Sequence, residues 1–570
     1  MILKELLASD TALNSEMKSA SKEEIHDFNI GLTLETSVDQ LRHANPLPEG
    51  NVKIDNFHAA FKNYPHAFHD FSGQVIINDT ALWLKGLTGQ IDSSDIRFGG
   101  RVTDYALWFE KVKRGRTQIA FDLKSQRLAL RDLLGNTGQS YVPKDYQQEV
   151  ATGVWLRSKI DLRYDSCFQF ANIKIGNISG ALQQHPIRLD SISGNIKFGI
   201  DDFVKIDTLK GRIGNSDFNC SMRLYAGKDT VRRKKENFLQ FTSNLLDVDQ
   251  LSNYAATAEA AEQEEMAVLQ QGQGGDSTTT AGAGGAMQPA TTVHADAFNI
   301  FRIPFIDFNA SVSIGRLRYH HLGIKNLVTN ARMQANQQLY LDTLSMDIAG
   351  GTIGAHAHFN GSDPKKIYLR SRIRVQDVNI EKLMLKADYF GQDYVINKNV
   401  KGTLSGQIRS YVQIHPDLTP LIDQSEAQMD VEIRNGVLLN FAPMQAMSSY
   451  FSDKNLNMVR FDTLRDVLTF KNGALTIPGM NINSSLGFME ISGTQSMDMH
   501  MEYFLRIPLK LVTQAGFHKL FGKKQEEVDP NQVDAIEYRD KDKRIHFINL
   551  EIRGLPDDYK VSLGKAKGSG

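Results

Sequence analysis

The chain has 570 residues, 41% hydrophobic and 23% charged, so it is long enough for several hydrophobic cores or for one continuous core. Its 65 Lys and Arg residues are balanced by 66 Asp and Glu residues, which excludes the basic footprint of a nucleic-acid-binding protein. No run of about 18 apolar residues occurs, so the sequence predicts no transmembrane helix. Lys4 and Glu5 stand where a secretory leader would have its apolar stretch, so no signal peptide is predicted.

In chain order, we expect a leader or helical segment at 1–30 and β-groove repeats at 31–249. A helix and a low-complexity linker follow at 250–295, where 272–293 is rich in Gly, Ser, Thr and Ala and is predicted to be disordered and dispensable. A second β-groove is expected at 296–510, and a capping helix, final strands and a flexible tail at 511–570. Short helices are predicted near 1–10, 126–135, 254–271, 380–388, 443–452 and 508–522.

A spaced set of apolar residues recurs four times along these segments. Counted from its first anchor, each copy has marked positions 1, 3, 6, 10 and 15, and the fourth copy is weaker because it has Ser at position 10. The initial step of two is the period of a strand with one apolar face. Repetition at this length predicts one supersecondary unit stacked on copies of itself. The four sets are Leu82, Leu84, Leu87, Ile91, Ile96; Val204, Ile206, Leu209, Ile213, Phe218; Leu339, Leu341, Leu344, Ile348, Ile353; and Leu475, Ile477, Met480, Ser484, Met489.

Turn residues punctuate the repeats. Asn435-Gly436 and Asn472-Gly473 each follow a strand-like run, and Asn-Gly favours a two-residue hairpin turn. An apolar residue followed by Ser-Gly occurs at Ser72-Gly73, Ser193-Gly194 and Ser405-Gly406. Glycine inside a strand commonly marks a bulge or bend, so this device predicts a sheet that curves in the same way each time.

The residues expected to point inward are those at period-two spacing within the copies and in the alternating run from Met497 to Ile507. An inner apolar face without a protein partner would be a binding surface. The candidate groove residues are Leu82, Leu84, Leu87, Ile206, Leu209, Leu341, Leu344, Ile477, Met499 and Met501.

The histidines suggest no metal site. Three of them occupy the turn before the anchors of their own copy, and a position that recurs by copy is better explained as turn architecture than as one ligand set. No nucleophile, phosphate-loop or paired-cysteine motif is present, so we expect a non-enzymatic protein without metal or cofactor. The two cysteines, Cys167 and Cys220, are predicted to be buried free thiols. The histidines in question are His66, His69, His185, His320, His321, His356 and His358.

Two basic features leave alternatives open. Arg370, Arg372 and Arg374 form a line on the polar side of a strand, which is either a solvated face or a site for anionic headgroups. A predicted helix at 509–524 either lies on a membrane surface or caps the end of the sheet.

The C-terminal third strongly resembles the AsmA-like C-terminal region. The resemblance covers about 300–510, and 30–245 is similar repeated material. It depends on the order of a Ser-Gly strand, a first Asn-Gly run, a Phe-Asp-x-Leu strand and a second Asn-Gly run. The segments that carry it are Gly402–Gly406, Ile433–Leu438, Phe461–Leu464, Phe470–Ile477 and Ile491–Gly493.

The resemblance implies a taco-like β-groove in the periplasm of Gram-negative bacteria, anchored in the inner membrane and involved in outer-membrane lipid homeostasis. The family is related in shape to TamB and to chorein-type bridge lipid transfer proteins. Because the family's N-terminal membrane helix is missing here, the resemblance implies an N-terminally truncated chain whose anchor lies in a segment outside it. Phospholipids and envelope or outer-membrane proteins are the implied partners.

The sequence therefore predicts a mostly β protein, an elongated repeat-built antiparallel β-groove with a few short helices. About 25–30 strands stacked at about 4.8 Å would give a groove about 120–145 Å long. Acyl chains fit such a groove, because each buried CH₂ contributes about 0.8 kcal/mol without directional demands. Two alternatives stay open. One is a structural repeat or scaffold that fills its own interior and influences outer-membrane protein targeting without carrying lipid. The other is a β-helical carbohydrate enzyme, which the uneven copy spacing disfavours.

Overall fold

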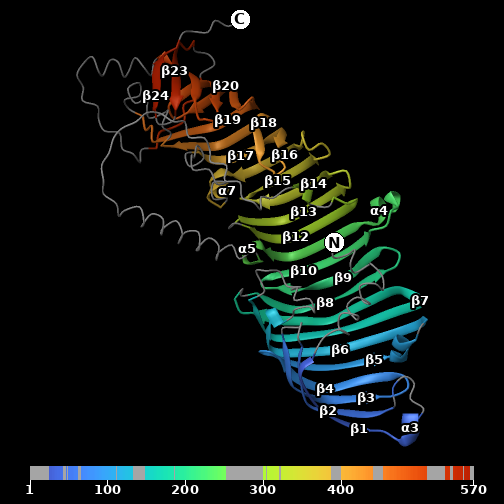
Figure 1. The fold of residues 1–570 in the computed structure, drawn as a ribbon. Coiled ribbons are helices and arrows are strands. Elements are labelled where there is room, and N and C mark those ends of the chain that lie inside the picture. Colours follow the sequence, from blue (N-terminus) through green and yellow to red (C-terminus); the bar gives the residue numbers. More distant parts are fainter. Residues whose placement is uncertain are drawn as a thin grey trace, which may run out of the picture. The chain divides into compact units, whose positions relative to one another are not determined.

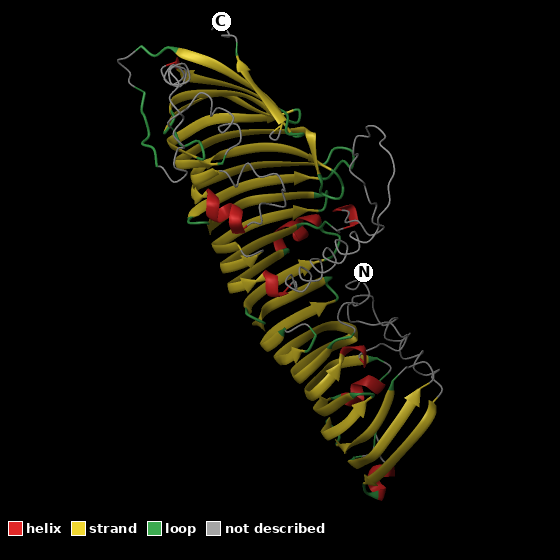
Figure 2. Cartoon of the chain, turned by 90° about the vertical axis from the view of Figure 1, so that its left-hand side faces the viewer, coloured by secondary structure: helices red, strands yellow, loops and turns green. Residues whose placement is uncertain are grey.

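The computed structural model divides the chain into two compact units, unit 1 (Met1–Glu264 with Phe308–Val312) and unit 2 (Glu265–Asp307 with Ser313–Gly570). Each unit is an antiparallel sheet with bowed strands and a few short helices (Figures 1 and 2), so the predicted mostly β, curled antiparallel fold is confirmed. The structure describes residues 25–42, 47, 49–61, 66–110, 112–132, 148–184, 187–251, 300–302, 305–319, 322–386, 400–440, 454–509, 533–539, 544–555 and 558–564.

Unit 1 is a meander in which each strand from β1 to β11 pairs antiparallel with the next. Strand β1 begins inside the segment that was predicted as a leader. The strands are β1 (Ile25–Glu35), β2 (Gly50–Phe61), β3 (Ala67–Ile77), β4 (Ala81–Ile91), β5 (Ser94–Thr103), β6 (Lys113–Ala129), β7 (Val150–Leu182), β8 (Arg188–Gly199), β9 (Phe203–Ile213), β10 (Ser216–Tyr225) and β11 (Phe238–Asp247). The helices are α3 (Val38–Arg42), η1 (Tyr105–Phe109), η2 (Leu130–Asp132), α4 (Thr230–Glu236) and α5 (Val248–Leu251).

Unit 2 repeats this architecture, with antiparallel pairs from β13–β14 through β23–β24. Strand β12 (Phe308–Tyr319) begins in unit 1 and continues into unit 2. The other strands are β13 (Leu322–Gln334), β14 (Gln338–Ile348), β15 (Gly351–Asn360), β16 (Tyr368–Asn379), β17 (Val400–Ile414), β18 (Pro420–Leu439), β19 (Met458–Lys471), β20 (Ala474–Ser484), β21 (Gly487–Ser496), β22 (Met501–Pro508), β23 (Phe547–Leu555) and β24 (Asp558–Leu563). The helices are η4 (Ile300–Arg302) and α7 (Ile380–Lys386).

Of the short helices predicted from sequence, α7 is present. Near 126–135, strand β6 instead continues to Ala129, and only the three-residue η2 follows. The linker from 252 onward and the capping helix beyond 509 lie outside the described residues. Among the residues that are described, no helix is long and apolar enough to cross a membrane.

Strand β7 is itself a β-hairpin made of two halves. Its first half pairs with β6 and its second half with β8. The chain reverses near Ser166, which has a left-handed φ of 65°. The two halves lie side by side, because the Thr152 hydroxyl donates to the Ala181 carbonyl at 3.2 Å and the Ser158 hydroxyl to the Lys174 carbonyl at 3.3 Å. The meander therefore continues through β7 without a crossover.

The four sequence copies are four hairpins of one design: β4–β5, β9–β10, β14–β15 and β20–β21. In each, the first strand has 11 residues and the second has 10. The first anchor is the second residue of its strand every time. The repeated pattern is thus a repeated supersecondary unit, as predicted.

Each hairpin contains a β-bulge at the same place, where the pattern steps by three residues. Leu84 and Leu87 pair with Gly100 and Phe98, so two residues of β4 face the single Gly99. The extra residue keeps the third anchor on the same face as the first two, which a step of three would otherwise reverse. The equivalent steps, Ile206 to Leu209, Leu341 to Leu344 and Ile477 to Met480, also coincide with register shifts.

The two Asn-Gly runs behave differently. Asn472 and Gly473 form the predicted two-residue turn between β19 and β20, with φ of 52° and 70°. The hairpin predicted at Asn435-Gly436 is wrong, because both residues lie within the continuous strand β18. Asn435 is left-handed there, and the ring of Phe461 on β19 occupies the space above Gly436 that a Cβ would fill. Asn435-Gly436 is therefore a β-bulge within β18, and the Phe461 ring packs closely on its backbone.

The Ser-Gly device marks an irregularity of the sheet, as predicted. Gly73 lies opposite the bulge of β4, and a Cβ there would come 2.8 Å from the Cα of Leu87. Gly194 is packed in the same way against Leu209 of the second copy. Glycine is needed at these positions because the bulged neighbouring strand approaches the backbone closely.

Candidate functional site: the apolar face

All marked positions of the four copies lie on one face of their hairpins. Directly opposed residues of an antiparallel pair share a face, and the register of each hairpin places its anchors in one such set. We call this surface the apolar face of each unit and the opposite surface its polar face.

In unit 1 the anchors belong to rows of apolar side chains that cross several strands. Leu82 lies between Ile77 and Val102, and its row continues across β6 and β7. A separate row contains the second copy's Ile206. The rows are Ile77–Leu82–Val102–Ile119–Ile160, Leu87–Phe98–Leu123–Leu156 and Ile173–Ile196–Ile206–Met222–Leu239.

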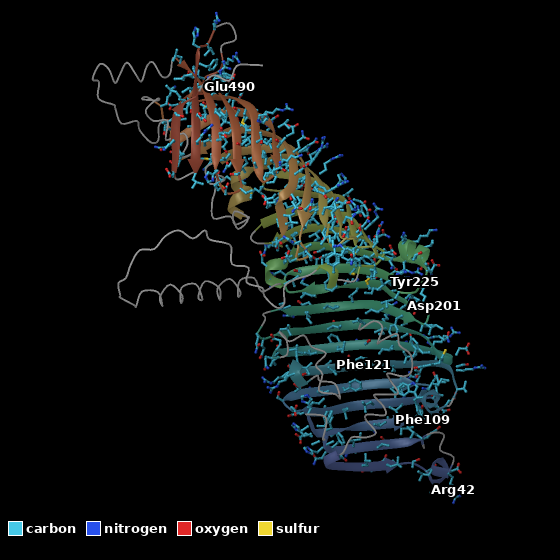
Figure 3. The ribbon with its side chains drawn as sticks, turned by 45° about the horizontal axis from the view of Figure 1, so that its top comes forward. Arg42, Phe109, Phe121, Asp201, Tyr225 and Glu490 are labelled. Atoms are coloured by element: carbon cyan, nitrogen blue, oxygen red, sulfur yellow. The ribbon has the colours of Figure 1, made fainter. Side chains whose placement is uncertain are left out.

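Phe121 belongs to the row of Leu84. Figure 3 shows it in the middle of the sheet of unit 1, while Phe109, Asp201 and Tyr225 mark an edge formed by strand ends. The rings of Phe121 and Phe98 stack with centroids 5.8 Å apart. Leu209, the third anchor of the second copy, pairs with Gly194 and Cys220 on the same face. Cys220 is a half-buried free thiol, whereas Cys167 is exposed, so the prediction of two buried thiols is wrong for Cys167.

In unit 2 the third copy forms a similar surface. The row of Leu344 crosses six strands as Leu344–Ala355–Ile373–Ile408–Met429–Leu468. The neighbouring row of Leu341 contains Ala357 and then Ser371 and Ser410, whose hydroxyls hydrogen bond to each other at 2.6 Å. Because each serine satisfies the other, this polar pair is compatible with an apolar surface.

The anchors of the first three copies are mostly half-buried. Leu82, Leu84, Leu87, Ile206 and Leu209 fall in this class, as do Leu341 and Leu344 of the third copy. They pack on their row neighbours but keep part of their surface accessible. Seven of the predicted groove residues therefore lie on an accessible apolar face.

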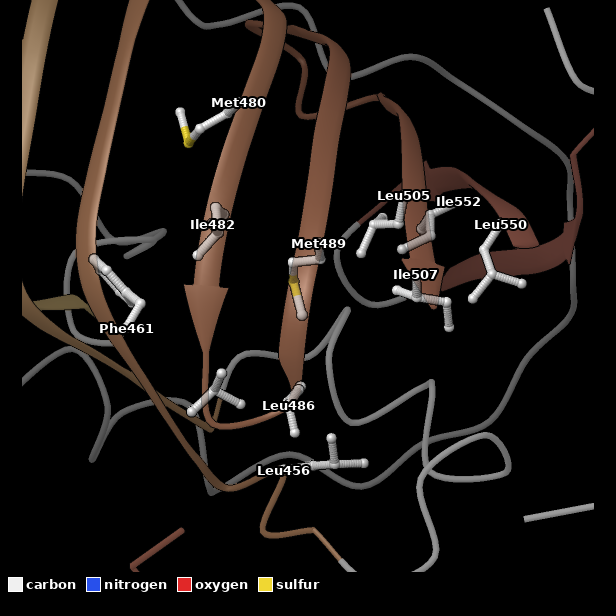
Figure 4. Close-up of a cluster of buried hydrophobic side chains, with 11 residues drawn as sticks. Leu456, Phe461, Met480, Ile482, Leu486, Met489, Leu505, Ile507, Leu550 and Ile552 are labelled. Atoms are coloured by element: carbon white, nitrogen blue, oxygen red, sulfur yellow. The ribbon is translucent and has the colours of Figure 1, made fainter. Parts of the chain in front are cut away.

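In the fourth copy the apolar face is buried beneath other side chains of the chain. Met480, Met489, Leu505, Ile507 and Leu550 are between 0% and 6% exposed and form one cluster (Figure 4). Ile477 packs against this cluster, and Met501 is only 6% exposed. The side chains predicted to line a groove here, Ile477 and Met501, thus lie in or against a filled core.

Two segments outside the strands lie against this closed end. The Asn455 N–H donates to Asp534 at 2.8 Å, and Lys454 forms a 2.8 Å ion pair with Glu537. The Glu537 N–H in turn donates to the Ser484 carbonyl at 3.0 Å. Residues 454–457 and 533–539 therefore tie the chain to the end of β20.

Met499 is a further correction. The alternating run that begins at Met497 predicted one strand, but β22 begins only at Met501. Met499 lies in the turn after β21 with a left-handed φ of 67°, and its N–H donates to the Ser496 carbonyl. Alternation alone did not reveal the turn because Met-Asp-Met-His has the same period as a strand.

His66 and His69 gather around the turn between β4 and β5. Buried His66 hydrogen bonds through Nδ1 to the Asp92 carboxylate, and His69 Nε2 lies 3.0 Å from the Asp92 carbonyl. The Ala67 N–H donates to the same carboxylate at 2.9 Å. Burial opposes ionisation of Asp92, but the Ala67 and His66 hydrogen bonds hold its pKa below the usual value. A hydrogen bond that His69 Nδ1 donates to the Asp70 carboxylate raises the pKa of His69.

This arrangement joins a turn to the start of β3, which agrees with turn architecture. His185, His320 and His321 lie outside the described residues. In the described part of the chain, no three His, Cys, Asp or Glu side chains converge as a metal site would require.

The polar face of unit 2 carries the predicted basic line. Arg370, Arg372 and Arg374 are exposed on β16, and Arg372 lies directly opposite Arg409 of β17. Arg370 packs over Tyr368 and Tyr411, with its guanidinium carbon 5.1 Å and 5.5 Å from the ring centroids.

The sequence reasoning missed the strands between the copies. Ile119, Phe121 and Leu123 of β6 and Leu156 and Ile160 of β7 complete the rows but carry no repeated pattern. Their period-two spacing was the signal that could have identified them.

Comparison with protein-family models, with curated proteins and with solved structures finds no match to this chain.

Proposed function

We propose that the protein is an AsmA-like component of the Gram-negative cell envelope that binds phospholipid acyl chains along its apolar face. It would carry them between the inner and outer membranes without chemical change, acting in the periplasm and anchored through a segment outside this chain. The supporting observation is the set of continuous, half-buried apolar rows in the first three copies.

Acyl chains suit these rows physically. Successive rungs of a row are about 4.8 Å apart, so a chain lying across the strands meets an apolar side chain at each step. Each CH₂ removed from water contributes about 0.8 kcal/mol, and no directional contact fixes its position. A lipid can therefore move along the face without large barriers, and this requires no catalytic residue.

The proposal is tested by native mass spectrometry of the purified chain for bound lipid. The double variant Leu341→Asp/Leu344→Asp should lose co-purifying lipid while its far-UV circular dichroism stays strand-like. The matched control is Ser345→Asp/Thr352→Asp, which adds the same charge at exposed positions of the polar face of these two strands. Equal lipid content in both double variants would contradict the proposal.

A structural scaffold that influences outer-membrane protein targeting is the second candidate. The filled core of the fourth copy favours it, because there the chain covers the apolar face with its own side chains. The scaffold predicts no co-purifying lipid from the native chain. It also predicts that Leu341→Asp/Leu344→Asp unfolds unit 2.

A further inference from the structure

The polar face of unit 1 contains a hollow of about 600 Å³ over β4, β5, β6 and both halves of β7. Its side is established by alternation. Leu84, Gly100, Phe121 and Ser158 form one row of the apolar face, so the residues on either side of each point to the polar face. Those flanking residues make up most of the lining, and the volume is in the range of small-molecule sites.

Small residues make the floor. Gly99 of β5, Ala120 of β6 and Gly176 of the second half of β7 lie there. A Cβ at Gly99 would have open space, with its nearest neighbour, the Leu84 carbonyl oxygen, 3.8 Å away. The hollow therefore exists because side chains are missing from its centre, and a larger residue at 99 would fill it.

Cations surround this floor. The hollow has five cationic residues and one carboxylate in its lining, and the cations are exposed. Arg101 packs over the Trp83 ring with its guanidinium carbon 4.3 Å from the centroid, which fixes one charge at the rim. The cationic residues are Lys85, Arg101, Arg157, Lys159 and Lys174.

The single carboxylate, Asp122, is already engaged. It accepts hydrogen bonds from Arg157 Nε and from Trp155 Nε1, both at 2.9 Å. Burial opposes its ionisation, but these donors hold the pKa of Asp122 below the usual value. Within the described residues, no carboxylate pairs with the other four cations of the hollow.

We propose that this hollow binds a phosphate-bearing anion. Four cations without a counter-charge around a common cavity match a multiply charged group better than one carboxylate, which would leave most of them uncompensated. The same chemistry belongs to a phospholipid headgroup and to a soluble phosphate ester. The hollow lies on the polar face, opposite the rows proposed to bind acyl chains. The phosphate-binding proposal is therefore independent of whether the protein carries lipid.

Two probes separate these sources. Isothermal titration calorimetry with inorganic pyrophosphate reports on a soluble anion, with sulfate at equal ionic strength as the reference. Co-sedimentation with phosphatidylglycerol vesicles, against phosphatidylcholine vesicles, reports on a headgroup. The native chain should bind at least one phosphate probe. Absence of binding to both would overturn the proposal.

Two variants test the site itself. Lys85→Gln/Lys159→Gln/Lys174→Gln removes charge, and Gly99→Leu fills the hollow while leaving every charge in place. The lysine variant should weaken binding about tenfold or more, because charge-assisted contacts to phosphate dominate such sites. Gly99→Leu should weaken binding to a similar extent, because its side chain occupies the space of the anion. The control Lys210→Gln/Lys228→Gln/Lys235→Gln removes the same charge from exposed positions of unit 1 outside the hollow and should leave affinity unchanged.

Suppose that both triple-lysine variants weaken binding equally and that Gly99→Leu binds normally. The anion would then be attracted to the basic surface as a whole, and the proposed site would be overturned. If Gly99→Leu fails to give a native circular dichroism spectrum, the contrast between the two lysine triples decides. Equal affinities of those triples would then refute the proposal.

Discussion

The imidazole ring of His358 on β15 stacks on the ring of Tyr340 on β14, with centroids 4.3 Å apart and planes 6° from parallel. The two residues are direct partners in the ladder, and Arg370 of β16 is the next residue in the same row. The Tyr368 ring meets the imidazole in an edge-to-face arrangement, with ring centroids 5.9 Å apart. His358 is thus a largely covered base beside a fixed cation.

This environment predicts a pH effect on stability. Burial, and secondarily Arg370, lowers the pKa of His358 from its ordinary 6.5. Below pH 6.5 the unfolded chain then binds more protons than the folded chain. The stability contributed by neutral His358 is therefore fully present above pH 6.5 and declines as the pH falls toward the pKa of His358 in the folded chain.

The measurement is the urea midpoint of unit 2 unfolding at about pH 7.5 and about pH 5.5 for the native chain and for His358→Phe. Phe keeps a stacking ring but cannot be protonated. The native chain should lose more stability than the variant on acidification. Equal losses would show that His358 does not titrate in this way.

Asp207 provides a second pH test in unit 1, in a lower pH range. It lies in the bulge of the second copy, and ion pairs with Lys197 at 2.8 Å and Lys205 at 2.7 Å lower its pKa to about 2. Its stabilising contribution is present above the ordinary value of 3.8 and is lost as the pH falls through about 2. The stability difference between the native chain and Asp207→Asn should therefore shrink from about pH 5 to about pH 2. A constant difference would exclude this ion-pair effect.

The open and closed parts of the apolar face should differ in their response to truncation. Leu505→Ala removes a side chain that is 3% exposed and should cost about 2–5 kcal/mol in the free energy of unfolding. Leu87→Ala removes a half-buried side chain and should cost only about 1 kcal/mol. Denaturant titration of both variants checks the contrast. Similar large losses would mean that the first copy is closed core as well.

Gly73 should tolerate no side chain. Gly73→Val places a Cβ 2.8 Å from the Cα of Leu87 and should destabilise unit 1 by about 1–3 kcal/mol through overpacking. Gly323→Val is the control, because a Cβ at Gly323 has no neighbour within 4 Å. Thermal unfolding of the two variants gives the comparison. A Gly73→Val variant as stable as the control would show that the bulged strand can move aside.

The anchors were predictable because their spacing is a local record of which side faces the apolar surface. The spacing did not reveal that the step from Leu84 to Leu87 is a bulge, since a bulge is defined by the partner strand. Asn435-Gly436 and Asn472-Gly473 are the same dipeptide, each preceded by a basic residue, and the ring of Phe461 on the neighbouring strand distinguishes the first from the second. Met501 has the alternation of an open strand, but residues far away in sequence decide whether such a position is covered.

The recurrent hairpin also bears on how such a chain can change length. Its four copies have equal strand lengths and the same bulge position, so one copy can replace another without reversing the apolar face. A deletion of a single residue from the bulge, such as Gly86, would turn the anchors on one side of it toward water. Duplication of a whole hairpin would preserve every contact type within the sheet. Evolution or design can therefore change the length of each unit by adding or removing whole hairpins. Insertion or deletion of a single residue inside a hairpin would disrupt the apolar face.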